Sequence, residues 1–82
     1  MEIEHISEPI GVLADCTGGQ MRPLRFAWSG RTYKVSVVNA EWIDRQGDIW
    51  SLHYSIQSNG QTYLIHFDGK EAQWWLDETI LE

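Results

Sequence analysis

The dipeptide Asn59-Gly60 constrains the fold more than any other feature, because a run of alternating apolar and polar residues lies on each side of it. Asn and Gly both tolerate the positive φ that the two central residues of a type I′ turn require, so they predict a two-residue hairpin loop. Pairing Ser58 with Gln61 then sorts the apolar and polar residues onto opposite faces. A slip by one residue would mix the two faces, so burial selects this register.

This register predicts which side chains lie opposite each other. The apolar face pairs Ile56 with Tyr63, Tyr54 with Ile65 and Leu52 with Phe67, and Trp50 extends it. The polar face places His53 opposite His66, with Asp68 diagonal to His53. Each strand therefore has one face suited to a core and one suited to solvent.

A second hairpin is predicted around Ser29-Gly30. Pairing Trp28 with Arg31 aligns Phe26 with Tyr33 and Arg25 with Lys34. We expect the second strand of this hairpin to run on through Val37 towards Ile43, with a bend or bulge near Asn39-Ala40.

The rest of the chain also favours strands. Residues 44–48 read as a turn, and residues 69–72 reverse the chain so that Trp74 and Leu76 return to the apolar face while Trp75 points to the other side, near Thr62 or His66. Residues 9–15 predict a strand joined through residues 17–20 to one at 22–28. Only residues 71–82 offer any helical alternative, and their aromatic start argues against it.

The chain is therefore expected to be all-β. We predict five or six short antiparallel strands in a meander, curled into a small SH3-like or OB-like barrel. Residues 1–82 form a single small domain, with residues 1–8 as a candidate peripheral segment. The aromatic side chains expected inside are Trp50, Tyr54, Phe26, Tyr33, Phe67 and Trp74.

Length and composition narrow the class of protein. A chain of 82 residues can bury only a thin core, which five Trp, three Tyr and two Phe help to fill. The net charge of −6 works against passive binding to nucleic acid or anionic lipid. The single cysteine, Cys16, excludes an internal disulfide, and the acidic N-terminus is unlike a signal peptide. No apolar run is long enough to span a membrane, so we expect a cytoplasmic bacterial protein.

One stretch resembles a known family. The run F-A-W-S-G-R-T-Y-K-V (Phe26–Val35), followed by Trp42, Trp50, Y-L-I-H-F-D and W-W-L, is similar to a family of small uncharacterised bacterial β domains with the motif F-x-W-x-G-R-x-Y-x-V. The resemblance covers roughly residues 8–77. Some members are associated with lesion-bypass DNA polymerases, so the resemblance implies a nucleic-acid-associated accessory role, but it brings no catalytic signature.

The facing histidines raise the question of a metal site. His53, His66 and Asp68 are candidate ligands, because two imidazoles and a carboxylate suffice for an open zinc site. Side chains that stand parallel on an open sheet converge poorly, however, and the alternative is a solvated polar face. We therefore expect no resident metal and no cofactor. The acids Asp77, Glu78 and Glu82 are interpreted as a solvated tail.

The candidate contact residues are apolar and basic. Trp75, Leu64 and Trp42 are the candidate apolar anchors, and Arg25 and Lys34 are candidate polar contacts. Trp75 either meets a partner or packs under another segment of the chain. The basic pair either holds an anion or is neutralised by the protein's own acids.

The hypothesis that follows is a non-enzymatic module that binds an unknown protein partner. A nucleic-acid-associated accessory domain is the alternative, and weak metal binding at the histidine pair is the third. A homodimer remains open.

Overall fold

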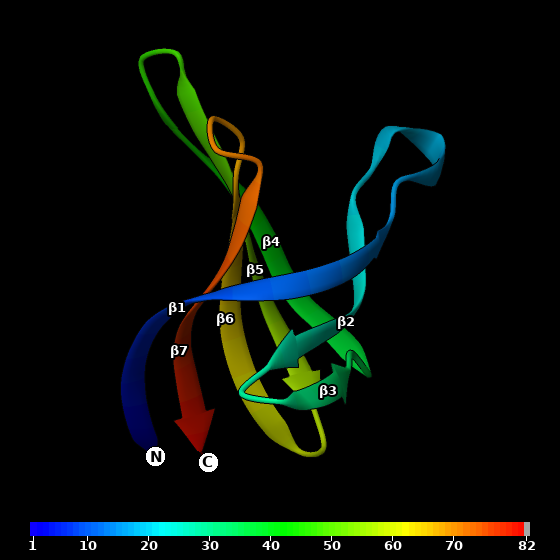
Figure 1. Cartoon of the computed structure of the whole chain (residues 1–82), viewed down its shortest axis with the longest axis vertical. Coiled ribbons are helices and arrows are strands. Elements are labelled where there is room, and N and C mark those ends of the chain that lie inside the picture. The colour runs from blue at the N-terminus through cyan, green and yellow to red at the C-terminus, as the bar shows by residue number, and fades with distance from the viewer. Residues whose placement is uncertain (82) are drawn as a thin grey trace.

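The computed structural model describes residues 1–81, and Glu82 of the expected solvated tail lies outside them. Strands make up almost all of the described chain (Figure 1). They are β1 (Glu2–Asp15), β2 (Arg22–Trp28), β3 (Arg31–Lys34), β4 (Val37–Gln46), β5 (Ile49–Ser58), β6 (Gln61–Asp68) and β7 (Gln73–Leu81). A single 3-10 turn, η1 (Thr17–Gly19), joins β1 to β2.

The strands form one antiparallel sheet in the order β3-β2-β1-β7-β6-β5-β4. Neighbours in the sheet are consecutive in the chain everywhere except where β1 pairs with β7. The all-β class and the meander are thus confirmed, although there are seven strands rather than five or six. The count rises because the predicted long strand from 31 to 43 is interrupted at Val35 and Ser36, which leaves β3 and β4 as separate elements.

The expected closure into a barrel is wrong, because β3 and β4 remain unpaired with each other at the two ends of the sheet. Val35 and Ser36, which connect β3 to β4, bond to both end regions of the sheet. The Val35 N–H donates to the Leu24 carbonyl at 2.9 Å, and the Ser36 N–H donates to the Gln57 carbonyl at 2.8 Å. Beyond this point the register of β4 against β5 shifts between Val38 and Ala40, where the sequence predicted a bulge. A bulge bends its strand, and β4 leads away from β2.

Both predicted hairpins are confirmed in register. Ser58 lies opposite Gln61 and His53 opposite His66, while Trp28 lies opposite Arg31. The turn residues Asn59 and Gly60 have φ values of 50° and 77°, as a type I′ turn requires. The alternation of the sequence therefore determines which face each side chain occupies.

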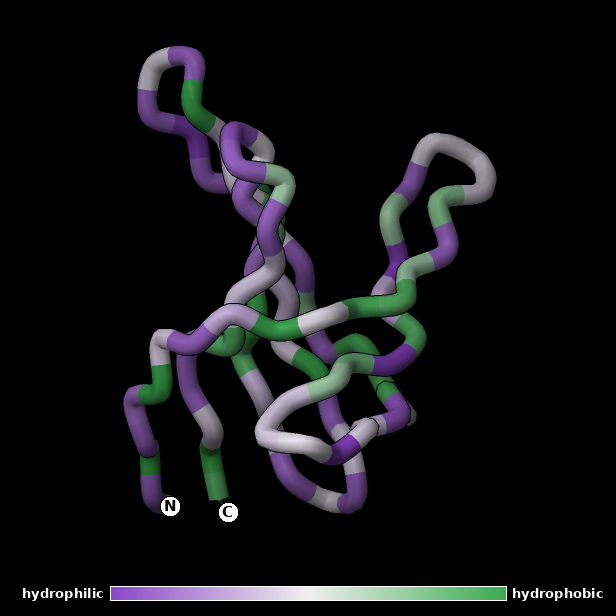
Figure 2. The backbone as a smooth tube through the Cα atoms, viewed as in Figure 1, coloured by the Kyte–Doolittle hydropathy of each residue, from purple (hydrophilic) through white to green (hydrophobic). Residues whose placement is uncertain are grey.

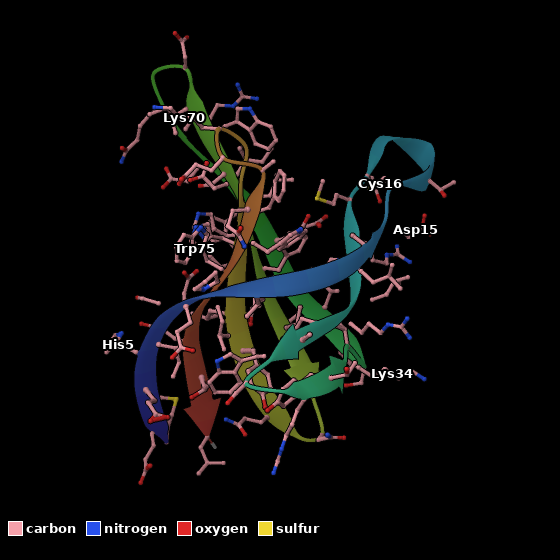
Figure 3. All side chains as sticks on the ribbon, in the orientation of Figure 1. His5, Asp15, Cys16, Lys34, Lys70 and Trp75 are labelled. Carbon is pink, nitrogen blue, oxygen red and sulfur yellow. The ribbon has the colours of Figure 1, made fainter. Side chains whose placement is uncertain are left out.

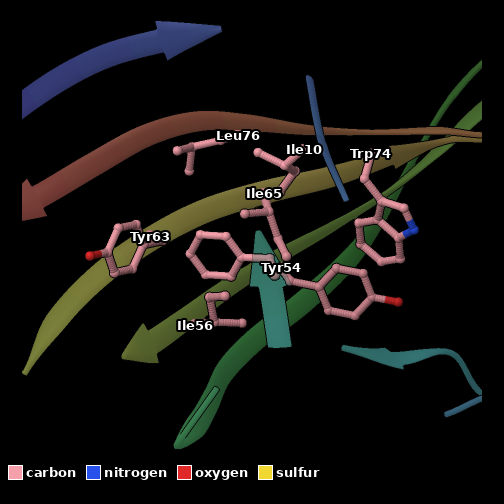
Figure 4. Close-up of a cluster of buried hydrophobic side chains, with 8 residues drawn as sticks. Ile10, Tyr54, Ile56, Tyr63, Ile65, Trp74 and Leu76 are labelled. Atoms are coloured by element: carbon pink, nitrogen blue, oxygen red, sulfur yellow. The ribbon is translucent and has the colours of Figure 1, made fainter. Parts of the chain in front are cut away.

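The core lies on the inner face of the curled sheet (Figure 4). Its buried members come from five strands and are Ile10, Phe26, Tyr54, Ile56, Tyr63, Ile65, Trp74 and Leu76. Tyr33 and Phe67 are partly buried against them, as expected. Aromatic rings occupy much of this small core, with Phe26 stacked on Tyr33 at a centroid distance of 4.8 Å. Large rings bury more area per residue than aliphatic side chains, which suits a short chain.

Trp50 does not belong to the core, contrary to expectation. It faces the inner side, but it lies near the end of the β4–β5 hairpin that projects beyond the core, and 37% of it is exposed. Its ring covers Gly69 of the next hairpin, so that a Cβ built at Gly69 would overlap the indole. The face of Trp50 was predicted correctly from alternation, whereas its burial depended on how far β5 extends past the rest of the sheet.

Residues 2–8 form the first half of β1, where they pair with β7, and the second half of β1 pairs with β2. β1 thus crosses between two parts of the sheet (Figure 1). The turn that follows is held by Asp15, whose carboxylate accepts hydrogen bonds from the Thr17 N–H and hydroxyl at 2.9 and 2.6 Å. These hydrogen bonds lower the pKa of Asp15.

Hydrophobic residues follow the centre of the sheet, while most turns are polar (Figure 2). An apolar residue, Ile49, also lies near the end of the β4–β5 hairpin and is 48% exposed, while Ile43, farther from the turn on β4, is 56% exposed. Among residues 1–81, the structure contains no helix with the length and apolar character needed to cross a membrane.

Candidate functional site

A row of four stacked rings crosses the outer face of the sheet. Trp42, His53, His66 and Trp75 lie directly opposite one another on β4, β5, β6 and β7. The ring centroids of neighbours are 5.5, 5.0 and 6.5 Å apart, and their planes are 12°, 22° and 14° from parallel. The outer face of an antiparallel sheet presents directly opposed residues side by side, and here every such position holds a planar ring.

The four rings of the row differ in their exposure to solvent. Trp42, on the edge strand β4, is 46% exposed, whereas the other three rings are partly buried. Trp75 was expected near Thr62 or His66, and it lies opposite His66. Its ring stacks on the imidazole of His66 on one side, and Pro9 of β1 lies directly opposite it on the other side, so neighbours on both strands flank the outward-facing indole.

Polar partners hold the two imidazoles in place. The Ser51 hydroxyl and His53 Nε2 are 2.8 Å apart, and His66 Nδ1 lies 2.8 Å from the Asp77 carboxylate. Burial lowers the pKa of His53 below its ordinary value, and the neighbouring His66 lowers it further. The charges of Asp77 and Asp44 act in the opposite direction. His53 is therefore a predominantly neutral ring at neutral pH.

Three groups in the row region have the composition of a metal site. His53, His66 and Asp77 each offer a ligand atom, and these atoms all lie within 4.8 Å of one another. The lone pair of an imidazole nitrogen lies in the plane of its ring, and these two rings are only 22° from parallel. Their lone pairs therefore do not converge on a single ion. The arrangement favours stacking and hydrogen bonding over metal coordination.

Asp68, the carboxylate expected near His53, occupies a different role. Its side chain accepts hydrogen bonds from the N–H groups of Lys70 and Glu71 at 2.9 and 3.2 Å, which holds the turn between β6 and β7. These bonds also lower the pKa of Asp68. The carboxylate that lies beside the histidine pair is that of Asp77, which contacts His66.

Sequence reasoning did not single out Asp77, and assigned it to a solvated tail. The structure places it in β7, partly buried, at a shift in register. Ile65 pairs with Leu76 and Leu64 with Glu78, so Asp77 has no residue directly opposite it on β6 and its side chain reaches His66. The sequence did contain one indication of this position. Asp77 follows Trp75 by two residues, and side chains two residues apart in a strand point to the same face.

The expected contact residues fall into two groups. Leu64 is partly buried on β6 and shares the outer face with His66 and Trp75. Arg25 and Lys34 are exposed and opposite each other on β2 and β3. The labelled side chains of Trp75 and Lys34 lie on opposite sides of the molecule (Figure 3). The basic pair therefore does not share a surface with the ring row.

The strand β4 forms a long free edge, because it pairs with β5 on one side only. Nine of its ten residues are exposed, Val38 being the exception. Trp42 and Ile43 stand on its two faces near its middle, 46% and 56% exposed. Half of the backbone groups of an edge strand point away from its neighbour, so β4 offers both hydrogen-bonding groups and apolar side chains.

A groove, here named the β2–β4 groove, runs between residues 19–24 and residues 35–43. It consists of three hollows of about 320, 300 and 270 Å³ that share lining residues from one to the next. The first two share Gln20, Met21 and Glu41, and the second and third share Arg22, Pro23 and Val38. The groove therefore follows the seam along which the sheet fails to close.

The chain was compared with models of protein families, with curated proteins and with solved structures, and none of them matches it. The resemblance of residues 8–77 to small bacterial β domains therefore stays a prediction.

Proposed function

We propose that this protein is a non-enzymatic interaction module that binds another protein by adding an extended segment of it to the free edge of β4. The single observation that carries the proposal is the edge itself, in which nine of ten residues are exposed and Trp42 and Ile43 project from opposite faces. An extended peptide beside an edge strand gains main-chain hydrogen bonds, and its side chains contact those of the edge.

Free edges in monomeric proteins are usually protected against such pairing. The first half of β1, which pairs only with β7, shows this protection, because Glu2, Glu4 and Glu8 line it. β4 carries charged residues as well, namely Glu41, Asp44 and Arg45, but it adds the large exposed aromatic side chain of Trp42. Trp is enriched among the residues that contribute most to binding at protein interfaces.

Charge favours a protein partner over the alternative of nucleic acid. β4 carries Glu41 and Asp44 against one basic residue, Arg45, and Asp77 lies beside the ring row, so the charge near Trp42 is acidic on balance. Phosphate groups would be repelled there. The basic residue Lys34 lies on the other side of the molecule from Trp75 (Figure 3), and Arg25 lies directly opposite Lys34.

Site-specific photocrosslinking tests the proposal. The photoreactive residue p-benzoylphenylalanine replaces Ile43 on β4 in one variant and Glu4 on the acidic edge of β1 in a matched control. Irradiation in the native cells should produce a covalent adduct with one defined protein at position 43 and none at position 4. Adducts at both positions, or none at position 43, would contradict the proposal.

A further inference from the structure

We infer that the extended segment bound by β4 carries an arginine directly opposite Trp42, and that its guanidinium stacks on the indole as a fifth plane of the ring row. This inference rests on the proposed function and names the side chain by which the free edge selects its ligand. The row of four rings then ends in an open stacking position.

The indole of Trp42 has one covered face and one open face. His53 stacks on it from the β5 side, with ring centroids 5.5 Å apart and planes 12° from parallel. The opposite face of the indole therefore points beyond the edge of the sheet, where no strand of residues 1–81 pairs with β4. The β4–β5 and β1–β2 hairpins point apart on this side (Figure 1). A strand added to β4 would place one of its side chains against the open face.

The direction of the backbone groups shows what kind of pair the added strand makes with Trp42. The Trp50 carbonyl accepts a hydrogen bond from the Gly69 N–H, so Trp50 directs its backbone groups away from β4. The register is continuous from residue 40 to residue 55, so His53, three residues after Trp50, directs its groups towards β4 and bonds to Trp42. Trp42 therefore forms a non-hydrogen-bonded pair with any antiparallel strand on its other side.

Non-hydrogen-bonded pairs bring facing side chains closest together. His53 directs its backbone groups away from His66, so these two residues form such a pair. Their ring centroids are 5.0 Å apart, which is the shortest of the three distances in the row. The open position opposite Trp42 is of the same kind and suits a planar group that lies flat on the indole.

Acidic side chains lie near the open position on the outer face. Asp44 follows Trp42 by two residues without a shift of register, so the two share a face, and Asp77 bonds to His66. Burial lowers the pKa of His53, whereas the charges of Asp77 and Asp44 act to raise it. Both carboxylates therefore favour a positive charge at the row.

The protein's own basic residues lie elsewhere. Arg45 is the one Arg or Lys in the described strands β4–β7, and it lies three residues from Trp42, on the inner face. Arg22 of β2 lines a hollow beside Glu41, which alternates with Trp42 and so faces the inner side as well. A cation beside Trp42 on the outer face is therefore left to the ligand.

Arginine combines the two properties that this position favours. Its guanidinium is planar, so it lies flat on an indole, and it is always charged, so the acids attract it. A residue opposite Trp42 is also diagonal to Asp44, at a Cα separation of about 7–8 Å, which a long side chain spans. The edge of the guanidinium can then bond to the carboxylate while its plane covers the ring.

The ligand is a segment of a different protein. A second copy that added its own β4 in antiparallel fashion would continue the sheet with Arg45 on the inner face, away from Trp42. It would also bring another net charge of −6 to an acidic surface.

The probe for the test is a phage-displayed library of short linear peptides, selected on the full chain. Selected peptides should share one Arg. With the synthetic peptide, the amides of Glu41, Ile43 and Arg45, which alternate with Trp42 and face away from β5, should become protected from exchange. The side-chain protons of the peptide's Arg should shift upfield in NMR spectra, because they lie over the face of an aromatic ring.

Two variants of the protein and one of the peptide isolate the stacking. Trp42→Ala should weaken binding about tenfold and abolish the upfield shift. Trp75→Ala removes the same side chain from the other end of the row and, as the matched control, should leave the affinity unchanged. A peptide with Lys in place of Arg keeps the charge but loses the plane, so it should bind the unaltered protein severalfold more weakly.

The outcomes separate this inference from the proposed function. Peptides that protect these amides of β4 without a shared Arg, or that bind Trp42→Ala equally well, would overturn the stacked arginine while the interaction module stands. Enrichment of no peptide, or binding without protection in β4, would overturn both. Concentration-dependent protection of the same amides without peptide would identify a second copy as the occupant and contradict the choice of partner.

Discussion

His53 and His66 lie face to face across β5 and β6, with ring centroids 5.0 Å apart, and Trp42 and Trp75 close the stack at its two ends. Opposed rings on neighbouring strands attract each other beyond the area that they bury. The histidine pair therefore belongs to a structural row that spans four strands and joins the edge strand β4 to β7.

The stack predicts an energetic coupling between neighbouring rings. A double-mutant cycle with Trp42→Ala and His53→Ala should give a coupling of about 0.5–1.5 kcal/mol in the free energy of unfolding, measured by urea denaturation. The cycle with Trp42→Ala and Trp75→Ala, which lie at opposite ends of the row, should be additive. Zero coupling for the first pair would contradict the stacking.

The protonation of His53 predicts a pH dependence of stability. Its folded-state pKa lies below the ordinary value of 6.5, so between the two values the unfolded chain binds more protons. The free energy of unfolding should therefore fall as the pH is lowered from about 7.5 to about 5.5. His53→Gln should reduce the dependence of the free energy of unfolding on pH over this range.

His5→Gln is the matched control for that measurement. The side chain of His5 is 77% exposed and pairs with Glu78 outside the ring row. The substitution His5→Gln should therefore leave the contribution of His53 to the pH dependence of stability unchanged. If His53→Gln and the wild type lose stability equally over this range, the neutral state of His53 does not stabilise the fold.

Zinc should have little effect on the folded protein. The ring planes of His53 and His66 direct their lone pairs along nearly parallel lines, and the same rings bond to Ser51 and Asp77. Equimolar Zn²⁺ should therefore leave the midpoint of thermal unfolding unchanged. A rise in the midpoint that His53→Ala abolishes would show that the rings rotate to converge on the ion.

Gly69 predicts a steric effect on Trp50. Gly69→Ala would drive a methyl group into the indole, which should cost about 1–3 kcal/mol in the free energy of unfolding and shift the Trp fluorescence. In the background of Trp50→Ala the same substitution should cost much less, because the ring is gone. An equal cost in both backgrounds would place the origin of the effect in the turn instead.

The fold was predictable where local chemistry decides it. Asn59-Gly60 and Ser29-Gly30 select tight turns, and alternation then determines the registers of both hairpins and the face of every side chain on them. The bulge near Asn39-Ala40 was predictable for the same reason. These features depend on residues close together in the chain.

What the sequence could not show depends on the relative positions of distant strands. Whether β4 meets β2, or leaves a groove beside it, has no local signature, and so a closed barrel was expected. The exposure of Trp50 depends on how far the β4–β5 hairpin projects. The contact of Asp77 with His66 depends on a shift of register between β6 and β7 that alternation alone would not place.

Amide hydrogen exchange of the protein without ligand, measured residue by residue by NMR, shows whether β4 is a free edge in solution. Alternate amides of Val37–Gln46 should exchange orders of magnitude faster than those of β5 and β6, at any protein concentration. Uniform protection along the whole of β4 would contradict a free edge, because the edge would then already have a partner.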